Sequence, residues 1–199
     1  MIPRHLKIGI AILLVAVLVA AFYLRRMRGR AATPVPRVAD SRPIAPPVAG
    51  PTEQVTLFVA YDDAGILRPQ STRLTLPSGR QQRAQELLRA LLGIYLDQPS
   101  PHPIPAGSEV RAVYLVEPNL AVIDTNAAFA DGHRSGIFVE ELTVTSLVQT
   151  LAANIPGINR VKILVDGKER ETLAGHADLS ALYDTAAVSK AVEQLGSSQ

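Results

Sequence analysis

The chain has 199 residues, with 20 Lys and Arg against 18 Asp and Glu, and it contains no cysteine. Six of the basic residues lie in residues 1–30, which contain no acid, so the remaining 14 bases and all 18 acids give residues 31–199 a net charge of −4. This distribution lacks the basic surface that nucleic-acid binding requires, and the absence of cysteine excludes a thiol nucleophile. We therefore expect no nucleic-acid partner.

The first predicted element is a membrane anchor in residues 1–30. Ile8 to Leu24 form an uncharged run of 17 residues. As a helix this run spans about 26 Å, close to the lower limit for crossing a bilayer. A cleavable secretory signal is the alternative, but the arginine cluster at residues 25–30 is the wrong flank for a processing site. The sequence therefore predicts an uncleaved single transmembrane helix, which makes the membrane one partner of the chain.

The orientation of this anchor is left open by its flanking charges. Four arginines follow the apolar run and, under the positive-inside rule, favour a cytoplasmic C-terminal domain. Large domains can nevertheless be translocated despite such charges.

Residues 31–54 are predicted to be a proline-rich, disordered linker. They hold six prolines among small and polar residues, a composition that cannot bury enough apolar surface to fold. In an extended form of about 3.1 Å per residue, the linker would reach about 75 Å.

One domain of ordinary size is predicted for residues 55–183. Val55–Tyr61 and Ile66–Leu76 are extended patterns separated by a short polar turn, which indicates a first hairpin. Apolar residues then recur at helical spacing from Ala84 to Tyr95. This spacing predicts an amphipathic helix, for which Ser78 is the expected cap.

The second half of the domain repeats this order of elements. Val110–Val116 and Leu120–Asp124 indicate a second hairpin, and a second helical pattern covers residues 137–154. Arg160–Val165 and Glu169–Leu173 are predicted to be the last two strands of the domain.

The predicted elements follow the order ββαββαββ. Hairpins separated by helices are typical of an α+β domain, so we expect a mixed, largely antiparallel sheet covered by two helices. The transmembrane helix precedes this domain, and residues 184–199 are predicted to form a short C-terminal helix and tail.

The usual catalytic and nucleotide-binding motifs are absent: there is no HExxH, GxSxG, phosphate-binding loop or GxGxxG. His102, His133 and His176 each stand alone in a predicted loop, and no pair has the spacing of metal ligands. We therefore predict no catalytic residue, metal or cofactor. Asp131 beside His133 and Asp178 beside His176 offer acid–base pairs, but such loop groups are usually solvated.

A polar group at the start of the second helix is the best candidate for a ligand-binding site. Helical spacing places Glu140 and Glu141 beside the apolar stripe. Asp124, Asn126 and Arg134, in the segment before this helix, are expected to line the same edge. Acids in a first helical turn also interact favourably with the helix dipole, which is the structural alternative for the two glutamates.

Several segments along the body match a known domain in order and spacing. They are Val55–Tyr61, Ala84–Leu92, Ile104–Val110, Ala121–Asp124 with Phe129, Leu147–Leu151, Val161–Gly167 and Leu173–Leu179. Together they resemble the GerMN domain of spore germination and sporulation proteins, from Val55 to Leu182.

This resemblance implies an extracytoplasmic domain on a signal, lipid or transmembrane anchor, associated with cell-envelope or cortex processes and without known catalytic residues. Because the chain has no lipobox cysteine, the anchor is expected to be the helix. The resemblance therefore favours an extracytoplasmic orientation over the one that the charge rule favours. Gly175–Asp178 resembles the terminal motif of the family, and we expect it to be a structured turn.

The sequence thus predicts a membrane-anchored, extracytoplasmic GerMN-like binding or scaffolding module, not an enzyme, whose partner is peptidoglycan or an envelope protein complex. A link to sporulation or germination is part of what the resemblance implies. One alternative is a glycan-acting hydrolase that pairs Glu140 or Glu141 with Asp124 or Asp131, since glycoside hydrolysis uses two carboxylates. The other alternative is a membrane adaptor that faces the cytoplasm.

Overall fold

The computed structural model describes residues 50–197 of the chain. The predicted transmembrane helix and nearly all of the predicted linker lie outside these residues. Among the helices that are described, none is both long and apolar enough to cross a bilayer. The division of the chain into anchor, linker and domain therefore stays a prediction.

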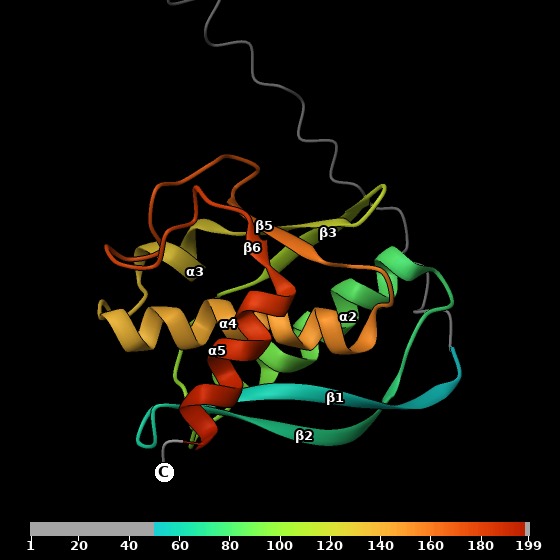
Figure 1. The fold of residues 1–199 in the computed structure, drawn as a ribbon, viewed down its shortest axis with the longest axis horizontal. Helices are drawn as coiled ribbons and strands as arrows, with labels where there is room; N and C mark the ends of the chain where they lie inside the picture. The colour runs from blue at the N-terminus through green and yellow to red at the C-terminus, as the bar shows by residue number, and fades with distance from the viewer. Residues whose placement is uncertain (1–49, 198–199) are drawn as a thin grey trace, which may run out of the picture. The chain divides into compact units, whose positions relative to one another are not determined.

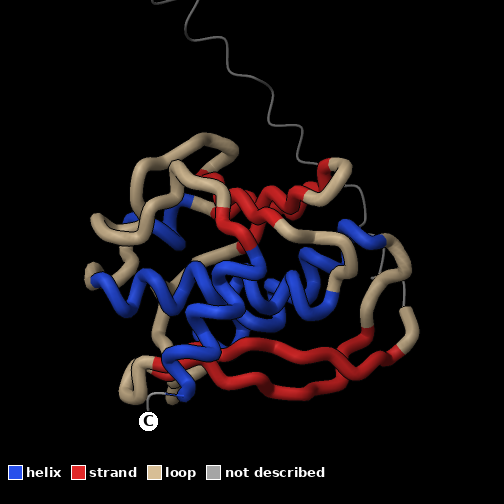
Figure 2. The backbone as a smooth tube through the Cα atoms, in the orientation of Figure 1, coloured by secondary structure: helices blue, strands red, loops and turns tan. Residues whose placement is uncertain are grey.

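The described residues form three layers, with helices between two separate sheets (Figures 1 and 2). One outer layer is a hairpin of β1 (Thr52–Tyr61) and β2 (Ile66–Thr75), and the central layer contains α2 (Arg80–Leu96) and α4 (Ile137–Asn154). The other outer layer is a four-stranded sheet of β3 (Val110–Val116), β4 (Leu120–Thr125), β5 (Arg160–Val165) and β6 (Tyr183–Asp184). Two further helices, α3 (Ala127–Asp131) and α5 (Thr185–Ser197), complete the fold.

The α+β class and both hairpins are confirmed. β1 and β2 pair antiparallel over all ten residues of each strand. β1 begins at Thr52, three residues before the predicted start, and Glu53 in this added part forms a two-pronged ion pair with Arg83 of α2, at 2.8 and 2.6 Å. The contact fixes the first turn of α2 to the start of β1.

The helix α2 follows the predicted apolar stripe. Its buried residues are Ala84, Leu87, Leu88, Leu91, Leu92 and Tyr95. The expected cap was wrong, because the helix begins at Arg80 with Gly79 as the residue before it, and no side chain caps its amides. Ser78 lies one residue too early to accept a hydrogen bond from the first turn.

The four-stranded sheet is mixed, as predicted. β3 pairs antiparallel with β4, β4 runs parallel to β5, and β5 pairs antiparallel with β6. The helix α4 is the crossover between the two parallel strands, and its predicted bounds of 137–154 are confirmed. Val113, Ile123 and Ile163 lie side by side on the inner face of the sheet and are fully buried.

The prediction of one sheet is wrong, because helical side chains occupy the edge of β1 that a further strand would use. Three alternate backbone N–H groups of β1 donate to side chains of α4 and α2. The pairs are Thr56 N–H to Asn154 Oδ1 at 3.1 Å, Phe58 N–H to Thr150 Oγ1 at 3.0 Å and Ala60 N–H to Tyr95 Oη at 2.9 Å. These bonds replace the ladder of a neighbouring strand, so the hairpin remains separate.

The predicted strand Glu169–Leu173 is also wrong. This segment is irregular, with one isolated bridge between Thr172 and Asp178, and the short strand β6 pairs with β5 instead. The N–H of Leu173 donates to the carbonyl of Ala177 at 2.9 Å, which folds the segment into a local turn. The apolar Leu173 is fully buried within this turn, although its sequence context resembled that of a strand residue.

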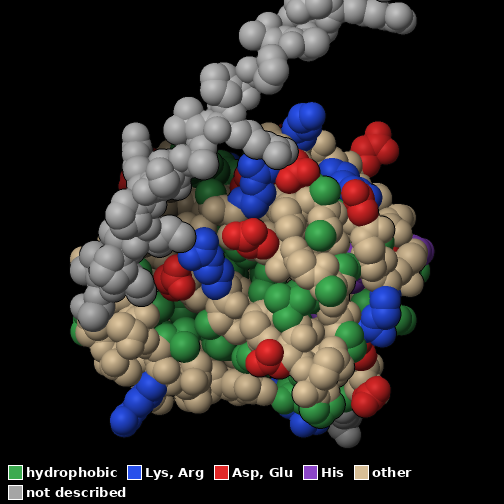
Figure 3. Space-filling model, turned by 180° about the vertical axis from the view of Figure 1, so that it is seen from behind, with side chains coloured by type: hydrophobic (Ala, Val, Ile, Leu, Met, Phe, Trp, Pro, Cys, Tyr) green, Lys and Arg blue, Asp and Glu red, His purple; other side chains and the backbone are tan. Residues whose placement is uncertain are grey.

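The face of the domain in Figure 3 carries charged side chains of both signs among apolar ones. A few large apolar side chains of the described residues are strongly exposed. They are Leu96, Tyr114, Val116, Ile137, Phe138 and Leu182.

Candidate functional site

The start of α4 carries the most exposed large apolar side chains of residues 50–193. Ile137 and Phe138 are adjacent, and the two residues are 66% and 72% exposed to solvent. The loop 132–136 precedes them, and the loop 174–177 packs against the same helical turn. We call these two loops, with residues 137–140, the α4 corner.

A buried carboxylate joins the two loops of the α4 corner. The side chain of Glu140 is fully buried and accepts five hydrogen bonds. Its Oε1 accepts from the amide of Gly136 at 3.0 Å and from His176 Nδ1 at 2.9 Å, and its Oε2 accepts from the amides of Ala174, His176 and Ala177 at 2.9, 2.9 and 3.0 Å. The donors come from both sides of the helix start, so the charge of Glu140 holds the corner together.

The donors around Glu140 also set its protonation state. Burial alone would raise the pKa of this carboxyl, but the hydrogen bonds from His176 and from the surrounding amides hold it well below its ordinary value. Glu140 is therefore ionised at neutral pH and fully used by structural contacts. All five of these hydrogen bonds come from groups of the α4 corner itself.

The other predicted site residues do not gather around Glu140. Glu141 is an exposed residue, although partial burial of its carboxyl raises the pKa of that group. Asp124 accepts a hydrogen bond from the amide of Gly167 at 2.7 Å, beside Arg111. Asn126 caps α3 through the amide of Phe129 and also bonds residues 107 and 109.

Arg134 is the predicted residue that joins the α4 corner to the rest of the domain. Its guanidinium is half-exposed and pairs with Asp62, the residue that follows β1. The binding role of the five predicted residues stays a prediction. Arg134, Glu140 and Glu141 lie at or beside the α4 corner. Asp124 and Asn126 make their contacts in other parts of the fold.

A buried polar network lies beneath the loop 132–136, and its centre is the hydroxyl of Thr143. The contacts are Asp62 Oδ1 to His102 Nδ1 at 2.5 Å, His102 Nε2 to Thr143 Oγ1 at 2.6 Å, His133 Nε2 to Thr143 Oγ1 at 2.8 Å, His133 Nδ1 to the Arg134 carbonyl at 2.8 Å and Thr143 Oγ1 to the Val139 carbonyl at 2.9 Å. We call this set the Thr143 network. It connects the end of β1, the loop between α2 and β3 that contains His102, the loop 132–136 and α4.

The Thr143 network contains more contacts than neutral side chains can satisfy. Each contact needs one hydrogen, because the ends of the network are a carboxylate and two carbonyls that only accept. Two neutral imidazoles and one hydroxyl supply three hydrogens for the five contacts. Two of the contacts therefore lack a hydrogen while both histidines are neutral.

Burial nevertheless favours the neutral histidines. It lowers the pKa of His102, against the opposing effect of Asp62, and it lowers the pKa of His133, against the carbonyl of Arg134. Burial would raise the pKa of Asp62, but hydrogen bonds from His102 and Arg134 hold it below its ordinary value. The network therefore combines an ionised Asp62 with two imidazoles that resist protonation.

Sequence reasoning missed most of this network. Asp62, His102 and Thr143 are about 40 residues apart along the chain, so no local motif joins them. One signal was present, since Thr143 lies between apolar residues in a helix that is buried over most of its length. The pairing of His133 with Asp131 does not form, because Asp131 binds Arg170 at 2.5 Å.

Three of the carboxylates considered for a hydrolase make contacts that stabilise the fold. Glu140 is saturated, Asp124 binds a backbone amide, and Asp131 is paired with an arginine. Two hollows of the described surface lie at the β3–β4 turn and on the β1–β2 hairpin, and neither is lined by these acids. Within residues 50–197, no group of three or more acidic or histidine side chains is arranged to hold a metal ion.

The sequence matches the model of a known protein family. The family model described as "Germane: Sporulation and spore germination" matches residues 56–171, which is more than half of the chain. The chain therefore belongs to this family of sporulation and spore-germination domains, and the resemblance to the GerMN domain is confirmed. No curated protein matches the chain.

Solved structures with a similar fold include proteins from Clostridium perfringens and Bacillus subtilis. A candidate lipoprotein from Clostridium perfringens is 21% identical, with a TM-score of 0.47, and the match covers 71% of this chain and 93% of that protein. The tandem GerMN domains of the sporulation protein GerM from Bacillus subtilis are 19% identical, with a TM-score of 0.48, covering 65% of this chain and 44% of that one. The first GerMN domain of GerM alone is 18% identical, with a TM-score of 0.44, covering 64% and 93%. Likeness at this level assigns no function.

Proposed function

We propose that the chain is a membrane-anchored, extracytoplasmic binding or scaffolding module of the cell envelope, and that the α4 corner is its contact surface for an envelope protein. The observation that carries this proposal is the exposed pair Ile137 and Phe138 on a frame held by buried polar contacts. Membership of the sporulation and germination family supports the setting in the envelope.

The chemistry of the α4 corner suits a protein partner. Large apolar side chains that are mostly open to solvent are favoured where a partner covers them, and an aromatic ring is a common anchor of such contacts. Arg134 and Glu141 supply a polar rim of both charges beside this apolar pair. The polar rim and apolar centre are the usual composition of a protein interface.

The rigidity of the α4 corner supports the same proposal. Glu140 fixes the loop 174–177, and the Thr143 network fixes the loop 132–136. A surface that is already ordered loses little conformational entropy when it binds. Phe138 therefore projects from a preorganised support.

The experiment uses the full chain in its native membranes, with a chemical crosslinker and detection of the chain by a tag. We compare the unaltered chain with Ile137→Ser/Phe138→Ser and with Leu182→Ser, a control at another exposed apolar residue. We expect a discrete crosslinked species that the double variant loses and the control retains. If all three chains give the same species, the α4 corner is not the contact surface.

Peptidoglycan is the alternative partner, and a second assay tests for it. Detergent-solubilised full chain is sedimented with isolated sacculi, and both bound protein and released muropeptides are measured. If the chain binds sacculi and this binding depends on Phe138, the partner of the α4 corner is peptidoglycan and not an envelope protein. Release of muropeptides would overturn the non-enzymatic role. A reporter fused after the last residue tests the orientation, since alkaline phosphatase is active only outside the cytoplasm.

A further inference from the structure

The four-stranded sheet has an open edge at β3. Tyr114 and Val116 of this strand are 48% and 47% exposed, on the outer face of the sheet. The opposite edge is β6, which is two residues long and continues directly into α5. The edge of β1 in the other sheet is occupied by helical side chains, and the edge of β2 contains Pro69, which has no N–H to donate to a further strand. The edge of β3 is the unpaired edge of the four-stranded sheet.

The sequence of this edge is symmetric in charge. It reads Arg-Ala-Val-Tyr-Leu-Val-Glu from Arg111 to Glu117, with Tyr114 at the centre and opposite charges at equal distances from it. The flanking positions on both sides of Tyr114 are apolar. If two copies of this strand run antiparallel about Tyr114, Ala112 pairs with Val116 of the other copy. Arg111, which lies at a β-bulge just before Ala112, then comes near the Glu117 that follows β3 of the other copy.

The charges at the two ends of β3 favour a second copy of the same strand, and they favour antiparallel over parallel pairing. In a parallel pairing, like charges would lie side by side at both ends, which is destabilising in a sheet. In the antiparallel pairing, the two Tyr114 rings are directly opposite on the outer face, where an aromatic cross-strand pair is favourable. Val113 lies opposite Leu115 on the inner face, so the apolar layer over α2 continues across the junction.

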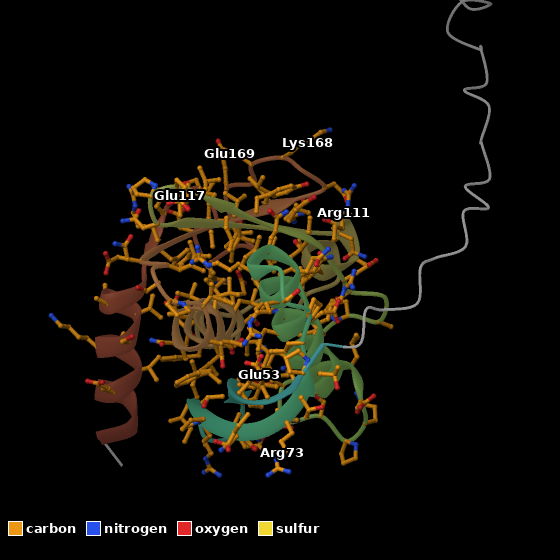
Figure 4. All side chains as sticks on the ribbon, turned by 90° about the vertical axis from the view of Figure 1, so that its right-hand side faces the viewer. Glu53, Arg73, Arg111, Glu117, Lys168 and Glu169 are labelled. Carbon is orange, nitrogen blue, oxygen red and sulfur yellow. The ribbon has the colours of Figure 1, made fainter. Side chains whose placement is uncertain are left out.

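Both charged ends are accessible. The side chain of Arg111 is 47% exposed, and its contacts with Asp166 at 2.9 Å and Asp124 at 3.8 Å leave further N–H groups free. Glu117 is exposed and has no ion-pair partner within the described residues. Figure 4 shows Arg111 and Glu117 well apart, on the side of the molecule that holds the four-stranded sheet.

We propose that β3 pairs antiparallel with β3 of a second copy of this chain about a two-fold axis at Tyr114, which joins two four-stranded sheets into one sheet of eight strands. A two-fold contact of this kind is closed, because it uses the same edge of both copies. The proposal does not depend on the α4 corner, so the two can fail separately.

The test uses single cysteines in the full chain, which has none of its own. Tyr114→Cys places its thiol opposite the same residue of the second copy. Opposite residues in an antiparallel pair have Cα atoms about 4.5 to 5.5 Å apart, which is within disulfide range. We expect Tyr114→Cys in membranes to form a disulfide-linked dimer under mild oxidation, as measured on a non-reducing gel.

Two matched variants show whether the linkage reports this register. Val116→Cys has the same exposure, but the axis places it opposite Ala112, so two copies of residue 116 lie about 13 Å apart. Phe138→Cys is more exposed and lies on α4. Both are expected to give little dimer. Equal linkage by either variant, or no linkage through Tyr114→Cys, would overturn the proposal.

Charge reversal tests the contacts at the two ends. In the Tyr114→Cys chain, Arg111→Glu or Glu117→Arg alone creates repulsion in the dimer and is expected to reduce the linked fraction. The two reversals together restore opposite charges and should recover the dimer, although the internal pair of Arg111 with Asp166 is still lost. Failure of the double reversal to recover linkage counts against the antiparallel register.

Discussion

The two ends of α4 serve different purposes, although one helix contains both. The C-terminal end builds the fold, since Thr150 and Asn154 bond the backbone of β1 and Leu151 between them is fully buried. The N-terminal end combines a buried carboxylate and a threonine hydroxyl with the exposed Ile137 and Phe138. Ionisable groups hold one end of the helix, and neutral groups hold the other. The two ends should therefore respond differently to substitution and to pH.

The largest expected effect is at the N-terminal end. Glu140→Ala leaves the amides of Ala174, His176 and Ala177 without their acceptor, and unsatisfied buried donors cost about 1 to 3 kcal/mol each. We expect the free energy of unfolding to fall by at least about 3 kcal/mol, as measured by urea denaturation. The neighbouring Glu141→Gln is the matched control and should change it by less than about 0.5 kcal/mol. Similar losses in both variants would remove the special role of Glu140.

The buried histidines near the N-terminal end of α4 should make the free energy of unfolding depend on pH. In the unfolded chain, His102 and His133 take up protons near their ordinary pKa of 6.5, whereas burial keeps them neutral to lower pH in the folded chain. The unfolded state therefore binds more protons below about pH 6.5, and the free energy of unfolding should decrease as the pH falls. Below about pH 4.5, Glu140 takes up a proton in the unfolded chain but stays ionised in the folded chain, which should add a further loss. Urea midpoints measured from pH 8 to pH 4 test this profile.

A substitution at the C-terminal end should be milder and independent of pH. Asn154→Ala removes its bonds with the N–H and carbonyl of Thr56, and a lost buried bond of this kind costs about 1 to 3 kcal/mol. The loss should be the same at pH 8 and pH 5, because no ionisable group takes part. A loss that grew with acidity would break the proposed division between the two ends.

The smallest effect is expected at the exposed pair. Phe138→Ser removes a side chain that is 72% exposed, so the free energy of unfolding should change by less than about 0.5 kcal/mol. The crosslinked species of the unaltered chain should nevertheless disappear when Ile137 is also replaced. Substantial destabilisation would instead make the apolar pair part of the fold.

The periodic parts of the fold could be predicted from the sequence. The bounds of α4 and both hairpins followed from apolar spacing, since burial on one face imposes that spacing. The division into two sheets could not be predicted, because spacing shows which face is buried but not which strand is the neighbour. Asn154 and Thr150 replace a strand at the edge of β1, and no local pattern marks them for this role.

The candidate site was predictable only in part, for a similar reason. The position of Glu140 beside the apolar stripe marked it as unusual, but three of its four amide donors lie 34 to 37 residues later in the chain. Asp62, His102 and Thr143 come from three separate elements and meet only in the folded domain. Exposure of Phe138 depends on what the rest of the chain leaves uncovered, which its own sequence context does not reveal.

The position of β1 has a mechanical consequence. The chain before Gly50 enters the domain at the first residues of β1, and the far end of this strand meets the α4 corner through Asp62 and Arg134. A pulling force between the preceding chain and a partner on the corner would run along the length of β1. The ten paired residues of β1 and β2 would then be loaded together in shear, and the contact of Glu53 with Arg83 would resist peeling at the entry point.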